Sequence, residues 1–112
     1  MLGLLVTGCT PPVAPVAPIA PPPIPSAGPG LERIIGQTTT AAIALIGKPT
    51  LDRREGPGHH LQFGRSACVL DVYYYPDPAG IELGRFAEAR RSDGQNREAG
   101  DCLTAILISA TK

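Results

Sequence analysis

The alternation of apolar and polar residues is strongest from Ala67 to Tyr75. A period of two residues predicts a β-strand whose side chains point alternately to the two faces of a sheet. The apolar side of this strand comprises Cys68, Leu70, Val72 and Tyr74, and the other side comprises Val69, Asp71, Tyr73 and Tyr75. The pattern therefore predicts a sheet with one buried face and one face that carries a carboxylate and two phenols.

A hairpin is predicted before this strand. Residues Leu51 to Glu55 and His60 to Gly64 flank the run Gly56-Pro57-Gly58, whose composition is typical of a turn. We therefore expect two antiparallel strands joined by a three-residue connection.

A return strand is predicted after the tyrosines. Turn-forming residues occupy Pro76 to Gly80, and Ile81 to Ala89 resumes a strand-like pattern. The alternation slips between Leu83 and Phe86, which predicts a β-bulge at Gly84.

A short helix is predicted near the start of the charged part of the chain. Thr38 is suited to cap its N-terminus, Gly47 is suited to end it, and Pro49 prevents its continuation. Apolar residues recur at helical spacing between these ends, namely Ala41, Ala42, Leu45 and Ile46.

A second helix is predicted from Asn96 to Ser109, because apolar residues recur there at helical spacing. Its apolar side comprises Ala99, Cys102, Leu103, Ile106 and Leu107, and its polar side comprises Arg97, Glu98, Asp101 and Thr104. Together the elements predict an α+β fold. We expect a small antiparallel sheet of three to four strands, packed with the short N-terminal helix and the C-terminal amphipathic helix.

Charge and proline content divide the chain near Gly30. No charged residue precedes Glu32, and nine of the thirteen prolines lie between Pro11 and Pro29. Proline favours extended polyproline II backbone, so residues 10–30 are expected to form a tether and residues 31–112 the single folded domain. The prolines could instead serve as a ligand for a proline-recognising domain.

Residues 1–9 end in a pattern typical of bacterial lipoprotein processing. Val6-Thr7-Gly8-Cys9 places an aliphatic residue and two small residues before an uncharged cysteine. Lipidation of Cys9 would anchor the chain outside the cytoplasm. The preceding apolar run is shorter than the roughly 7–15 residues of a signal segment and lacks a basic residue. Either the true start lies upstream, or Cys9 is a chance cysteine in an apolar N-terminus.

Cys68 and Cys102 are predicted to form a disulfide if Cys9 carries lipid. Both fall on faces that are expected to be buried against each other, and an oxidising compartment would join them. The alternative is two buried free thiols that pack as small hydrophobic side chains.

Several classes of function are not supported by the composition. Ten basic and ten acidic side chains give no net charge, which argues against nucleic-acid binding. Proline interrupts the apolar stretch from Val13 to Ile24, so no transmembrane helix is expected. His59 and His60 are the only histidines, and strand neighbours point to opposite faces, so no metal or other cofactor is predicted. No catalytic motif is present, and Asp71 is interpreted as part of an exposed strand face.

Protein contact is the function that remains, with two candidate surfaces. Tyr73 and Tyr75 provide rigid contact area with polar tips, although the same face could simply pack against a helix or the tether. Arg53 and Arg54, beside Glu55, form the second candidate, a charged corner at the end of the hairpin.

The run from Gly36 to Pro49 resembles the helix motif of the SmpA/OmlA small outer-membrane lipoproteins, which include the E subunit of the β-barrel assembly machine. Gly36, Thr38 and the closing Gly47-Lys48-Pro49 carry the resemblance, together with the order of hairpin, tyrosine strand and return strand as far as Ala89. The chain departs from the family in having no tryptophan and in its C-terminal cysteine-bearing helix.

The resemblance implies a compact α+β fold, a lipid anchor and work by protein contact, in outer-membrane assembly or envelope integrity. Thr10 and not an acidic residue follows Cys9. The resemblance to sorted bacterial lipoproteins then implies retention at the periplasmic side of the outer membrane. We expect a non-enzymatic, lipid-anchored envelope protein with an envelope protein as its partner. The alternative is a soluble periplasmic binding or enzyme-inhibitor module without an anchor.

Overall fold

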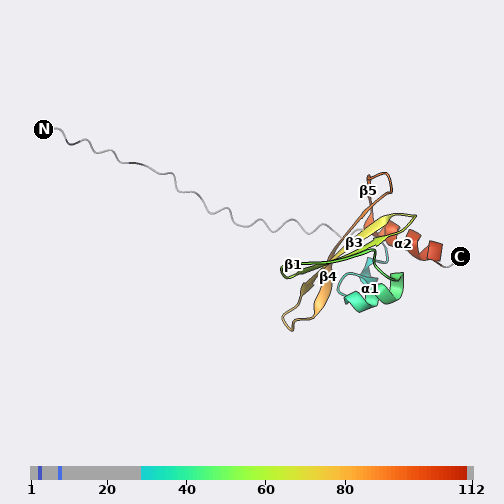
Figure 1. Ribbon diagram of the computed structural model, residues 1–112, viewed down its shortest axis with the longest axis horizontal. Coiled ribbons are helices and arrows are strands. Elements are labelled where there is room, and N and C mark those ends of the chain that lie inside the picture. The colour runs from blue at the N-terminus through green and yellow to red at the C-terminus, as the bar shows by residue number, and fades with distance from the viewer. Residues whose placement is uncertain (1–2, 4–7, 9–28, 111–112) are drawn as a thin grey trace.

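The computed structural model describes Gly3, Gly8 and residues 29–110 of the chain. The described domain is built on an antiparallel sheet in which the strands follow one another in sequence order, β1-β2-β3-β4-β5 (Figure 1). The strands are β1 (Leu51–Glu55), β2 (Gly58–Gly64), β3 (Val69–Pro76), β4 (Glu82–Arg90) and β5 (Asn96–Arg97). A 3-10 helix, η1 (Leu31–Arg33), and the helices α1 (Thr39–Ile46) and α2 (Ala99–Ala110) complete it. The predicted α+β class is confirmed, with five strands in place of the expected three to four.

One face of the sheet is covered by the helices and contains the hydrophobic core. The inward residues of β3 and the residue before it alternate as predicted, and Cys68, Leu70, Val72 and Tyr74 are fully buried. Apolar residues of η1, α1 and α2 join the same cluster, among them Leu31, Ala42, Ile46, Leu103 and Ile106. We call this side of the sheet the covered face.

The ends of α1 confirm the predicted capping residues. The Thr38 side-chain oxygen Oγ1 accepts a hydrogen bond from the backbone N–H of Ala41 at 3.2 Å. At the other end Gly47 adopts a φ of 110°, which favours glycine, and its N–H donates to the Ile43 carbonyl at 2.8 Å.

Helix α2 begins three residues later than predicted, because Asn96 and Arg97 form β5 instead. These two residues pair with Arg90 and Ala89 at the end of β4. The predicted position of Arg97 on the polar side of a helix is therefore wrong. Its guanidinium donates to the carbonyl of Ala67 at 3.1 Å, so Arg97 links the last strand to the chain entering β3.

The β1–β2 hairpin turns through two residues, not three, because Gly58 already pairs with Glu55 in the ladder. Gly56 has a φ of 55°, and the proline ring fixes Pro57 at negative φ. A positive followed by a negative φ is the order found in type II′ turns, which suit the twist of hairpin strands.

The predicted bulge at Gly84 is present, and it accommodates a segment that the sequence pattern did not reveal. Tyr73 pairs with Phe86 and Tyr74 with Gly84, which leaves one extra residue in β4. On the outer side of Gly84, its N–H donates to the Gln37 carbonyl at 2.9 Å and its carbonyl accepts from Gly36 N–H at 2.8 Å. The chain after η1 thus runs alongside β4 at the bulge, where Ile35 and Gly84 form a parallel bridge, and Ile34 is buried in the core.

The predicted disulfide between Cys68 and Cys102 is present in the structure. It joins the chain at the start of β3 to α2, with 5.9 Å between the Cα atoms and a sequence separation of 34. In the chain-entropy model, closing such a loop contributes roughly 4 kcal/mol to the free energy of unfolding. Cys9 lies outside the described residues.

Candidate functional site

The face of the sheet opposite the helices carries both predicted tyrosines. Alternation along β3 points Asp71, Tyr73 and Tyr75 away from the core that α1 and α2 cover. The predicted alternative, in which these tyrosines pack against a helix, is therefore wrong, and the tether lies outside the described residues. We call this side the open face and define it by Arg53, His60, Asp71, Tyr73, Tyr75 and Phe86.

Strand register places a row of side chains across the open face. Arg53 of β1 pairs with His60 of β2, which pairs with Tyr73 of β3, which in turn pairs with Phe86 of β4. The rings of His60 and Tyr73 stack with centroids 4.5 Å apart and planes at 11°. Tyr75 meets Phe86 edge to face at 6.3 Å. Aromatic pairs in these arrangements hold one another in place, so the row presents ordered rings.

The Asp71 carboxylate fixes the position of His60 in this row through a hydrogen bond. Its Oδ1 accepts hydrogen bonds from Nε2 of His60 at 2.7 Å and from Nε2 of Gln62 at 2.9 Å, and its Oδ2 accepts from Arg90 at 3.3 Å. The interpretation of Asp71 as an exposed residue is wrong, since only 3% of it is accessible. The longer side chains of His60, Gln62 and Arg90 contact the short Asp71 side chain and cover it. Because a carboxylate only accepts, Nε2 of His60 carries a proton and the ring orientation is set.

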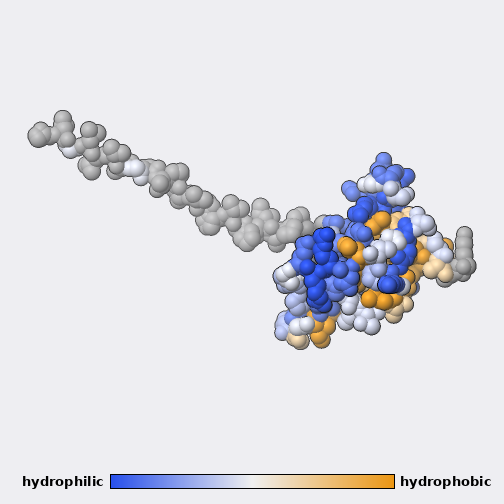
Figure 2. Space-filling model, viewed as in Figure 1, coloured by the Kyte–Doolittle hydropathy of each residue, from blue (hydrophilic) through white to orange (hydrophobic). Residues whose placement is uncertain are grey.

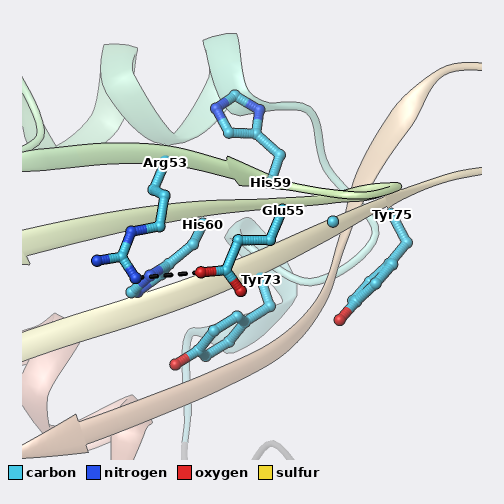
Figure 3. A pocket seen from close by; sticks show the side chains of 7 residues that line it. Arg53, Glu55, His59, His60, Tyr73 and Tyr75 are labelled. Atoms are coloured by element: carbon cyan, nitrogen blue, oxygen red, sulfur yellow. Dashed lines mark hydrogen bonds and ion pairs between the residues drawn. The ribbon is translucent and has the colours of Figure 1, made fainter.

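A hollow of about 330 Å³ opens between the aromatic row and the end of the hairpin. In Figure 3 Arg53, His60, Tyr73 and Tyr75 lie on one side of the strands, whereas His59 points to the other side. The Tyr75 ring lies over Gly58, where an added Cβ would come within 3.3 Å of Cε1. A side chain at position 58 would therefore fill part of the hollow.

The Tyr73 phenol keeps its proton at neutral pH. Burial raises its pKa above 10.0, and the negative charges of Asp71 and Glu88 raise it further against the opposing effect of Arg90. Tyr73 can therefore donate a hydrogen bond to a ligand carbonyl on the open face.

The predicted charged corner is divided between the two faces. Arg53 lies on the open face, where its Nη1 is 3.1 Å from Oε1 of Glu55 and both side chains are exposed. Arg54 lies on the opposite side, and its Nη1 contacts Oε1 of Glu82 at 2.6 Å. Only Arg53 can act together with the tyrosines. Figure 2 shows the strongest hydrophilic colour at the end of the domain where Figure 1 labels β1.

A cluster on the side of Arg54 was not anticipated from the sequence. His59 is buried, with Nδ1 2.6 Å from Oε2 of Glu82 and Nε2 2.5 Å from Oδ1 of Asp52. Each ring nitrogen needs a proton for both contacts to be hydrogen bonds. The hydrogen bond from Arg54 lowers the pKa of Glu82, the bond from His59 adds to this effect, and desolvation opposes both. The cluster ties the hairpin to the start of β4.

The residues that could have signalled this cluster are Asp52, Arg54 and His59, which share a face once the hairpin register is known. The expected opposite orientation of His59 and His60 is confirmed by their separate partners. Within residues 29–110, no three side chains of His, Cys, Asp or Glu are grouped as metal ligands would be. Neither described helix has the length and hydropathy needed to cross a membrane.

Comparison with models of protein families, with curated proteins and with solved structures finds no match to this chain. The resemblance to the SmpA/OmlA lipoproteins therefore remains a prediction from the sequence.

Proposed function

We propose that this chain is a lipid-anchored protein of the bacterial cell envelope that binds another envelope protein through the open face. The observation that carries the proposal is the ordered row of rings, His60 stacked on Tyr73 and Tyr75 against Phe86, on the face that the helices leave uncovered. In this proposal the domain works by binding and not by catalysis.

The open face has the physical properties of a contact surface. Tyrosine offers a large apolar area and a polar tip at a low cost in conformational entropy. The hydrogen bonds of Asp71 hold His60 in place before any partner arrives, and the His60 ring in turn supports Tyr73. Such preorganisation reduces the entropy that binding removes. Arg53 and Glu55 at the border add polar groups typical of an interface rim.

The proposed location depends on the N-terminal sequence and on the disulfide. Lipidation of Cys9 and a proline-rich tether would hold the domain at the periplasmic side of the outer membrane. The disulfide between Cys68 and Cys102 suits an oxidising compartment of this kind. The SmpA/OmlA resemblance extends the proposal to outer-membrane assembly or envelope integrity.

A photo-crosslinking amino acid at position 75 tests the contact surface. Tyr75 is 36% exposed, and Ile43 on α1 is 39% exposed on the other side of the domain, so position 43 is a matched control. In intact cells, irradiation should yield a discrete protein adduct from position 75 and none from position 43. The same adduct should disappear when Tyr73 is also replaced by serine. Adducts from position 43 alone would refute the assignment.

The anchor is tested separately by labelling with palmitate. A chain expressed in a Gram-negative host with a complete signal should incorporate the label and partition into detergent, and Cys9→Ser should lose both properties. If the unsubstituted chain is unlabelled while position 75 still crosslinks, the soluble periplasmic alternative replaces the anchored one.

A further inference from the structure

An unpaired carboxylate lies next to the aromatic row of the open face. Glu88 pairs with Asp71 across β3 and β4, so the two side chains lie on the same side of the sheet, and Glu88 is exposed. Arg90 is 3.3 Å from the Asp71 carboxylate, whereas Glu88 makes no ion pair or side-chain hydrogen bond with another described residue. Both oxygens of Glu88 are therefore free to accept hydrogen bonds from a second molecule.

The charge of Glu88 acts on the aromatic row. Burial is the largest cause that raises the pKa of Tyr73, and the carboxylates of Asp71 and Glu88 follow it. Arg90 opposes them, but it is bonded to Asp71, so the charge left unbalanced near the phenol is that of Glu88. Arg85, the extra residue of the bulge, is not among the groups that shift this pKa. The surroundings of Tyr73 thus favour a positively charged group.

The rings beside Glu88 suit a flat cation. Phe86 is two positions before Glu88 on β4, so both point to the same side with about 7 Å between their Cα atoms. Phe86 pairs with Tyr73 and meets the Tyr75 ring edge to face. A guanidinium stacks on aromatic rings and binds a carboxylate through two parallel hydrogen bonds, whereas an ammonium is a compact and strongly hydrated charge. Rings beside a free carboxylate therefore suit arginine better than lysine.

We propose that Glu88, Phe86 and Tyr73 form a binding site for an arginine side chain of the partner protein. The guanidinium donates to both oxygens of Glu88 and lies against the Phe86 and Tyr73 rings, and the Tyr73 hydroxyl donates to a backbone carbonyl of the same segment. The inference rests on the proposed function, since it takes the open face as the contact surface and names the group which that surface recognises. The rings need no rearrangement, because His60 and Tyr75 already hold them in place.

Three capped amino acids test the site on the full chain carrying Cys9→Ser, with its disulfide intact. The probes are N-acetyl-arginine amide, the neutral isostere N-acetyl-citrulline amide, and N-acetyl-lysine amide. Nuclear magnetic resonance titration should show the arginine probe shifting the ring signals of Phe86 and Tyr73, with an affinity about fivefold above that of citrulline and about twofold above that of lysine. Raising the ionic strength from about 0.01 M to about 1 M should weaken arginine binding and leave citrulline binding unchanged, because exposed charges are then screened.

Matched variants locate the bound guanidinium. Glu88→Gln keeps the shape of the side chain and removes its charge, so the affinity for the arginine probe should fall to that for the citrulline probe. Glu32→Gln removes another exposed carboxylate, on η1, and should bind the arginine probe as tightly as the unsubstituted chain does. Phe86→Leu should weaken binding of the arginine probe more than binding of the lysine probe, because only the guanidinium stacks on the ring. Ring signals recorded without probe confirm that each variant is folded.

Two results would overturn the proposal directly. One is equal affinity for the arginine and citrulline probes, and the other is an unchanged preference for arginine in Glu88→Gln. Tighter binding of lysine than of arginine would overturn the assignment to a guanidinium. If the arginine probe does not bind while position 75 still yields its adduct, this inference is wrong and the proposed function stands. Arginine binding without any adduct from position 75 would support the site and refute the cellular partner.

Discussion

The two faces of the sheet use different interactions to order neighbouring residues of the same strand. On the covered face, Tyr74 is fully buried among apolar side chains, and burial raises its pKa to about 12. On the open face, the adjacent Tyr73 and Tyr75 are ordered by ring contacts and by the hydrogen-bonded Asp71. The covered face therefore supplies stability, whereas the open face supplies an ordered surface that another molecule can contact. Substitutions that separate these two roles test the comparison directly.

The largest difference is expected between two adjacent tyrosines. Tyr74→Ala should lower the free energy of unfolding by about 3–5 kcal/mol, because it removes a fully buried aromatic side chain. Tyr75→Ala, which leaves the core intact, should cost about 1 kcal/mol through its contact with Phe86. Urea unfolding followed by circular dichroism measures both. Equal losses at the two positions would show that the open face is part of the core.

Loss of the disulfide should act on the covered face alone. Replacing Cys68 and Cys102 together by alanine should cost roughly 4 kcal/mol. For a domain of this size each kcal/mol corresponds to about 4–8 °C, so the melting temperature should fall by on the order of 20 °C. Crosslinking from position 75, measured below the new melting temperature, should persist. Its loss under those conditions would mean that the disulfide shapes the open face as well.

The bulge at Gly84 should tolerate no side chain. An added Cβ would come within 2.7 Å of the Ile34 carbonyl oxygen, which belongs to the backbone and cannot move aside easily. We expect Gly84→Ala to cost about 1–3 kcal/mol, whereas Arg85→Ala, at the exposed neighbouring residue, should be nearly neutral. Thermal unfolding of both variants measures the difference. An unchanged melting temperature in Gly84→Ala would indicate that the segment after η1 does not lie in close contact with β4.

Acid should weaken the cluster of His59 on the side of Arg54. The pKa of Glu82 is lowered from 4.5 in the folded state, mainly by the hydrogen bond from Arg54. Its contribution to stability is therefore complete above the unfolded pKa near 4.5 and is lost as the pH falls through the lower folded value. Urea unfolding measured in steps of about one pH unit between about pH 7 and about pH 3 should show a smaller loss of stability on acidification for Glu82→Gln than for the unsubstituted chain. Identical slopes would exclude Glu82 as a source of acid sensitivity.

The smallest expected effect is a gain in the free energy of unfolding. The Tyr74 hydroxyl is buried and has no hydrogen-bond partner among the described residues. Tyr74→Phe removes this polar group and should raise the free energy of unfolding by about 1 kcal/mol. Tyr73→Phe on the open face serves as the control and should change stability little. A loss of stability in Tyr74→Phe would reveal a partner for the hydroxyl.

Much of the fold follows from local sequence. The period-two pattern around β3 assigned Cys68, Leu70, Val72 and Tyr74 to the core, and each is fully buried. Thr38 and Gly47 were recognised as the ends of α1 because capping depends on residues within one turn of the helix. With Cys9 assigned to lipid, the pairing of Cys68 with Cys102 follows from two apolar faces that are expected to meet, and the structure contains this disulfide. These features depend on neighbours that are close along the chain, or on burial alone.

The site depended more on distant residues. Sequence placed Tyr73 and Tyr75 together on one face, because the side chains of a strand alternate. Only the register of β1, β2 and β4 brought Arg53, His60 and Phe86 beside them and sent Arg54 to the other face. Asp71 became buried for the same reason, since its partners come from neighbouring strands.

By itself, then, the sequence determined the periodic elements and their apolar sides, and it indicated Cys68 and Cys102 as the disulfide pair only if Cys9 is assigned to lipid. Tertiary structure decided three features: the start of α2 after β5, the pairing of the chain after η1 with Gly84, and the contacts of His59 with Asp52 and Glu82. The physical reason is the sequence separation over which each interaction acts. Periodicity and capping act over a few residues, whereas Glu82 reaches His59 only when three strands are already in register.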